Sequence, residues 1–161
     1  MQGTQLSIER DLLVHEAATA LGLLIFEFTR LDMELGLFLT WSDNGQSMGE
    51  LVKKVSAQTF SQRMDLLRQL AVKRYAESPE TQKSFFTWLA DANKLRVIRN
   101  ELFHGRWGFE PRDGRVANVT GLPNSDEQQS TFYSISELHD IVETTRSLRT
   151  RLDDLRSSHP L

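Results

Sequence analysis

Three polar side chains that can do chemistry lie close together in the segment RNELFH, residues 99–104. Histidine has an ordinary pKa of about 6.5, so His104 can accept or donate a proton near neutral pH. Arg99 carries a permanent charge and a planar fork of donors, which suits it to hold an anion. Asn100 lies four residues before His104, so on a helix its amide can orient the imidazole or bind a substrate. The spacing therefore predicts a site for proton transfer beside an anion.

The helix that must position these residues is predicted to span 79–104. Ser78 and Pro79 are typical of a helix start, because serine caps free amide groups and proline suits the first helical position. Gly105 is typical of a helix stop. His104 would then be the last helical residue, where a histidine can also serve as a simple partner of the helix dipole.

Arg99 falls on the apolar face of this predicted helix, at about 100° per residue. An arginine on such a face needs an anionic partner, because burying an unpaired charge is costly. The partner is either a ligand or a carboxylate of the first predicted helix, such as Glu27 or Glu34. The sequence alone leaves both alternatives open.

Arg99 and His104 are five residues apart, so they point about 140° apart around a regular helix. Their side chains then diverge by several ångströms and do not easily share one small ligand. Either the backbone turns at Gly105, or two copies of the chain pack these helices together and interleave their motifs. The second arrangement predicts a homodimer with a composite site.

The other elements are predicted from hydrophobic period and capping. Helices are expected over 7–41, near 48–57, from Thr59 to about 75, and over 134–156. Three capping boxes pair Ser47 with Glu50, Thr59 with Gln62, and Ser134 with Glu137. A turn at 111–114 predicts a small β-hairpin over 106–120, before a polar loop at 121–131. The predicted fold is all-α, an antiparallel bundle of about five helices with this hairpin inserted before the last helix. The residues expected in its core are Leu24, Phe28, Leu31, Trp88, Leu95 and Ile141.

A modest basic patch surrounds the end of the predicted helix 79–104. Lys94, Arg96 and Arg106 are candidate RNA-binding cations, and Trp107 offers a face on which a base could stack. The alternative is an ordinary hairpin, in which Trp107 and Phe109 complete the core and the arginines keep it soluble. Spacing does not separate the two.

Composition limits the classes of protein that remain. The 161 residues predict a single domain spanning 1–161, and a net charge of −3 argues against a general nucleic-acid coat. The absence of cysteine removes disulfides, thiolate nucleophiles and cysteine-ligated metals, and no other metal-ligand spacing is convincing. We expect no metal or other cofactor. No window of the sequence approaches the roughly 20 apolar residues of a membrane span, so we expect a cytoplasmic protein without one.

The order arginine, polar residue, three further residues and histidine at the end of a late helix resembles the signature of HEPN domains. In this chain Arg99, Asn100 and His104 match that signature. The resemblance implies a small helical domain that dimerises and a metal-independent endoribonuclease with Arg99 and His104 as catalytic residues and Asn100 in support. It further implies RNA products with 2′,3′-cyclic phosphate and 5′-hydroxyl ends, and a toxin or defence effector with an antitoxin or other protein partner.

Two other classes of function stay open on the sequence. One is a HEPN-like dimer that cleaves nothing and binds a nucleotide, an RNA or a protein. The other is a purely structural dimerisation bundle.

Overall fold

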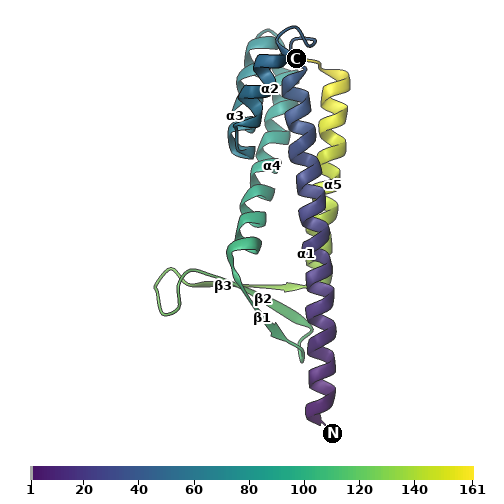
Figure 1. Ribbon diagram of the computed structural model, residues 1–161, viewed down its shortest axis with the longest axis vertical. Helices are drawn as coiled ribbons and strands as arrows, with labels where there is room; N and C mark the ends of the chain where they lie inside the picture. Colours follow the sequence, from purple (N-terminus) through teal and green to yellow (C-terminus); the bar gives the residue numbers. More distant parts are fainter. Residues whose placement is uncertain (1) are drawn as a thin grey trace. The chain divides into compact units, whose positions relative to one another are not determined.

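The computed structural model describes residues 2–161, with side chains from Thr4 onward. Over this range it is mostly helical, which confirms the predicted helical fold. Figure 1 shows five helices and three strands, in the order α1 (Gln2–Thr40), α2 (Met48–Ser56), α3 (Phe60–Arg74), α4 (Pro79–His104), β1 (Arg106–Glu110), β2 (Arg115–Thr120), β3 (Gln129–Ser134) and α5 (Ile135–Ser158).

The predicted hairpin is wrong, because the strands before α5 form a three-stranded antiparallel sheet in the order β1-β2-β3. The predicted loop at 121–131 ends at 128, and Gln129–Ser134 pairs with β2 from Thr120↔Gln129 to Arg115↔Ser134. The strand QSTFYS is polar and largely exposed, so it lacks the alternation that marks a half-buried strand. Backbone pairing with β2, rather than side-chain burial, makes it a strand.

Two of the three predicted capping boxes are confirmed. The Thr59 hydroxyl accepts from the Gln62 amide, and the Gln62 side chain accepts from the Thr59 amide at 2.8 Å. Ser134 and Glu137 exchange the same pair of bonds at 2.7 and 3.1 Å. The third prediction is wrong, because Ser47 precedes α2 but its side chain makes no cap bond.

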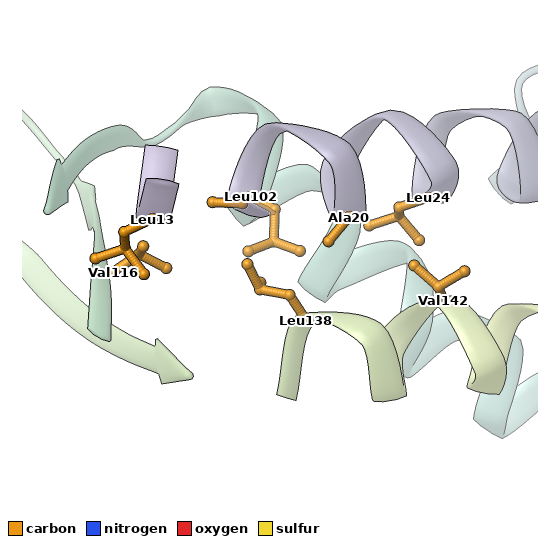
Figure 2. Close-up of a cluster of buried hydrophobic side chains, with 8 residues drawn as sticks. Leu13, Ala20, Leu24, Leu102, Val116, Leu138 and Val142 are labelled. Carbon is orange, nitrogen blue, oxygen red and sulfur yellow. The ribbon is translucent and has the colours of Figure 1, made fainter. Parts of the chain in front are cut away.

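The chain divides into two compact units. The first unit holds the chain up to Phe26 together with Leu95–Thr144, and the second holds Glu27–Lys94 together with Thr145–Leu161. The core of the first unit joins α1, the end of α4, β2 and the start of α5, as Figure 2 shows for its labelled side chains. Its buried members are Leu13, Ala17, Ala20, Leu24, Leu102, Val116, Leu138 and Val142.

The second unit has an aromatic core. Phe28 lies 4.9 Å from Phe60 between ring centroids, and the buried Trp88 donates from Nε1 to the Leu148 carbonyl at 2.8 Å. The prediction of buried Leu24, Phe28, Leu31, Trp88 and Leu95 is confirmed. The prediction of a largely buried Ile141 is wrong, because it packs against the edge of the first core and is half-buried, while the next residue, Val142, is buried within it.

Within the second unit, α1 and α5 run in the same direction. The ion pairs Glu27–Arg146 and Glu34–Arg149 show this, because both residue numbers rise together. Within the same unit, α4 runs in the opposite direction to α5 (Figure 1). The prediction of an antiparallel bundle therefore does not hold for the α1–α5 pair.

Helix α1 is apolar beyond its buried side. Its segment Thr4–Thr40 is long and apolar enough to cross a membrane by length and composition, so the expectation that no part of the chain approaches a membrane span is wrong. Within the first unit it exposes Ile8, Leu12 and Phe26, while Leu13, Leu24 and other residues are buried in the core. In its most apolar stretch 33% of the residues are buried, and the core helix of a soluble protein or a signal sequence near the N-terminus passes the same test.

Candidate functional site

The end of α4 is fixed to the sheet through one backbone carbonyl. The last carbonyls of a helix have no partner within the helix, so other groups must satisfy them. At Leu102, Trp107 Nε1 donates to the carbonyl oxygen at 3.2 Å, and Asn118 Nδ2 donates to the same oxygen at 3.4 Å. Since Asn118 is only 2% exposed, its contact is shielded from water. The two donors hold the helix end against β1 and β2.

Gly105 follows α4 immediately, and space rather than backbone conformation explains the glycine. Its φ is not among the positive values of the chain, so the left-handed cap expected of a helix-ending glycine is absent here. A Cβ at this position would lie 2.6 Å from Cγ of Asn118 and closer still to its two amide atoms. The prediction that α4 ends at His104 is confirmed. A glycine is required at position 105 because the Asn118 side chain occupies the volume that a Cβ would fill.

Arg99 is half-buried, and its guanidinium bends toward its neighbour in the chain. Nη1 donates to Oδ1 of Asn100 at 2.8 Å, and Cζ lies 5.9 Å from the ring centroid of Phe103. Asn100 was predicted to orient His104 or to bind substrate. In the structure its carbonyl oxygen holds the arginine.

His104 is exposed at the last position of α4. Asn100 lies four residues earlier, about 40° away around the helix and one turn along it. The hydrogen bond to Asn100 directs the Arg99 guanidinium toward this neighbour. The structure thus brings Arg99 and Asn100 into contact, while His104 is exposed at the end of the same helix.

Glu27 and Glu34 were the partners that the ion-pair alternative offered to Arg99. In the second unit, the Glu27 carboxylate is buried, and both carboxylates lie within 4 Å of arginines. These arginines are Arg30, Arg146 and Arg149. Both carboxylates therefore have cationic partners of α1 or α5.

The four predicted RNA-binding residues lie in different surroundings. Lys94 is exposed and 3.6 Å from the Asp91 carboxylate, and Arg96 is half-buried. Arg106 is exposed, and its Nη2 reaches the Gly121 carbonyl at 3.5 Å. Trp107 is half-buried and packs against the first core, as the structural alternative expected for it and for Phe109.

Sequence reasoning missed two residues near this site. Asn118 gave no signal, because a single asparagine in a strand has no spacing relation to His104. Tyr133 packs against Trp107 with ring centroids 6.4 Å apart. Burial raises the pKa of the Tyr133 hydroxyl, and the charges of Glu101 and Glu137 add to this effect. Tyr133 therefore stays a neutral hydrogen-bonding group near the helix end.

This helix end carries a guanidinium bonded to an amide, and an exposed imidazole at its last residue. Such a set can bind an anion and move a proton beside it. Among the described side chains, no group of three or more His, Cys, Asp or Glu residues is placed to hold a metal ion. Comparison with protein-family models, curated proteins and solved structures finds no match for the chain.

Proposed function

We propose that this chain is a metal-independent endoribonuclease of the HEPN type. The observation that carries the proposal is the bond from Arg99 to Asn100 on the side of α4 where His104 is exposed. Arg99 and His104 are the residues to which the HEPN resemblance assigns catalysis, with Asn100 in support. The two donors on the Leu102 carbonyl and the space under Gly105 give this helix end a fixed position.

The proposed reaction is an internal transfer at a phosphodiester of RNA. His104 accepts the proton of the 2′-hydroxyl while its oxygen bonds to phosphorus, and the bond from phosphorus to the 5′-oxygen breaks. A protonated His104 returns a proton to that 5′-oxygen. Arg99 stabilises the charge on the phosphoryl oxygens. The products carry a 2′,3′-cyclic phosphate and a 5′-hydroxyl, and DNA is inert because it lacks the nucleophile.

The proposal includes a homodimer with the α4 helices near its axis. The support for this arrangement is the divergence of Arg99 and His104 by about 140° around one helix, which two facing copies can offset. Two such helices facing each other would place both copies of Arg99 and His104 along one cleft.

The biological setting follows from the same proposal. The ribonuclease would be a cytoplasmic toxin or defence effector, and a protein partner such as an antitoxin would restrain it.

The first test is cleavage of mixed RNAs by purified protein in excess chelator. We expect wild type to produce cyclic phosphate ends, and Arg99→Ala and His104→Ala each to lose about 10² to 10⁴ in rate while staying folded. Arg74→Ala and His139→Ala, which remove exposed residues of α3 and α5, are the matched controls and should cleave normally. Equal cleavage by all variants would place any activity elsewhere. No cleavage by wild type on diverse RNAs would leave the non-catalytic binding module.

The composite site has its own test. Arg99→Ala and His104→Ala protomers are each inactive, but mixed dimers keep one arginine and one histidine across the cleft. Mixing the two variants should therefore restore part of the activity. A mixture no more active than either variant would locate the site within one protomer, and a fully active monomer in light scattering would overturn the dimer.

A further inference from the structure

The three-stranded sheet has one face on the core and one face that points away from it. Val116 is buried in the first core, and Trp107, Phe109 and Tyr133 pack against that core. Cross-strand partners share a face, and neighbours along a strand do not. The remaining positions form what we call the open face, in three rows: Arg106 with Val119 and Ser130, Gly108 with Ala117 and Phe132, and Glu110 with Arg115 and Ser134.

Phe132 is the prominent residue of the open face. Its side chain is 51% exposed, although phenylalanine is usually buried. The other residues in its row are Gly108 and Ala117, whose side chains are too small to cover a ring. The residues of its own row therefore leave the ring uncovered, and the Arg115 guanidinium is the group that lies over it.

Two arginines occupy the rows on either side of Phe132. The guanidinium carbon of Arg115 lies 5.6 Å from the Phe132 ring centroid, and its Nη2 donates to the Phe132 carbonyl at 3.2 Å. Arg106 is exposed in the other row. Glu110 is the carboxylate residue on the open face, so this face carries the two positive charges of Arg106 and Arg115 and one negative charge. An exposed ring between two cations fits a ligand that is both planar and anionic.

We propose that the open face binds single-stranded RNA, with one base stacked on Phe132 and phosphates held by Arg106 and Arg115. Base stacking on exposed aromatic rings, combined with cations along the backbone, is how proteins hold single strands without reading sequence. Duplex RNA keeps its bases inside the helix and cannot stack in this way. A protein partner would require a broader apolar surface than one phenylalanine.

This inference rests on the proposed ribonuclease function and adds the place where the substrate is held. Arg106 follows His104 by two residues, so their Cα atoms are at most about 7.6 Å apart. A strand bound on the open face thus passes beside the proposed catalytic histidine. Trp107, the aromatic residue that the sequence suggested for stacking, belongs to the core face instead.

The test measures binding separately from cleavage. A fluorescent 12-residue RNA with 2′-O-methyl groups cannot be cut, and its anisotropy reports the Kd for the intact protein. Phe132→Leu keeps an apolar strand residue but removes the ring, so we expect Kd to rise about 5- to 150-fold, the equivalent of about 1–3 kcal/mol per stacked base. Phe26→Leu, the same change at an exposed phenylalanine of α1, is the matched control and should leave Kd unchanged.

The arginines predict a second readout. Arg106→Gln and Arg115→Gln should each lower the slope of log Kd against log salt by about 0.7, because each removes one phosphate contact. Wild type that binds no single strand, a duplex RNA of the same sequence that binds more tightly, or a Phe132→Leu variant that binds like wild type would each overturn the open-face site.

The binding test also separates this inference from the ribonuclease proposal. If wild type binds the methylated RNA through Phe132 but cleaves no ordinary RNA, the open-face site stands and the catalytic proposal fails. If wild type cleaves RNA, and Phe132→Leu and both arginine variants bind and cleave like wild type, the catalytic proposal stands and the open-face site fails.

Discussion

Replacing Gly105 by alanine tests the joint between α4 and the sheet directly. The added Cβ would lie 2.6 Å from Cγ of Asn118, a distance that real Cβ atoms do not tolerate. If Asn118 stays, the surrounding core absorbs strain of about 1–3 kcal/mol. If it moves out, its buried amide loses the bond to the Leu102 carbonyl, which costs about 1–3 kcal/mol. Alanine also reduces the freedom of the unfolded chain, which restores about 0.4–1 kcal/mol. We therefore expect the free energy of unfolding to fall by about 1–2 kcal/mol.

Urea unfolding followed by circular dichroism measures this change. Gly108→Ala in β1 is the matched control, because its Cβ would meet only the Ala117 Cβ at an ordinary 3.7 Å. The control should be neutral or slightly stabilising. In an Asn118→Ala background the added Cβ at Gly105 has room, so Gly105→Ala should no longer destabilise. A Gly105→Ala protein as stable as Gly108→Ala, or a loss that persists without Asn118, would refute the steric explanation.

Three further predictions, on core packing, helix capping and pH dependence, are tested by the same urea unfolding. Phe28→Ala or Trp88→Ala should each lower the free energy of unfolding by about 3–5 kcal/mol, because both rings are buried, and an unchanged midpoint would contradict the packing described. Thr59→Ala should cost about 1 kcal/mol by removing the α3 cap, and Thr59→Ser should restore it. Burial, with repulsion from Asp153, raises the pKa of Glu34 above its ordinary 4.5, so the folded chain keeps this proton when the unfolded chain has released it. Its contribution to stability is therefore greatest below pH 4.5 and falls as the pH rises through the raised pKa. Unfolding at a series of pH values should show this slope in wild type and lose it in Glu34→Gln, and identical slopes would contradict the assignment.

Signals contained within a few residues were predicted well from the sequence. The box of Thr59 with Gln62 depends only on residues three apart, and it forms as expected. The box of Ser47 with Glu50 does not form, and Asp43, a residue outside the box, accepts the bond from the Ser47 amide that Glu50 was expected to accept. Asp43 Oδ2 accepts from the Ser47 amide at 2.8 Å, so the turn before α2 is held from its other end.

Features that depend on distant partners could not be predicted. The strand Gln129–Ser134 forms because the backbone groups along the second edge of β2 pair with it. The composition of QSTFYS does not indicate this pairing. Gly105 was assigned a conformational reason, since the local sequence shows a glycine after a helix. Its actual neighbour, Asn118, is 13 residues away in the chain and becomes visible only when β2 is folded against the helix end.

Arg99 shows why a helical projection alone could not decide the site. A projection places the Cβ atoms, and by that measure Arg99 and His104 are about 140° apart. The guanidinium is several bonds beyond the Cβ, and its bond to Asn100 places the charge beside a residue only about 40° from His104. The divergence that suggested a composite site therefore describes the Cβ positions and does not by itself fix where the guanidinium lies. Mixing Arg99→Ala with His104→Ala protomers is accordingly the measurement that separates a site shared by two chains from one completed within a single α4.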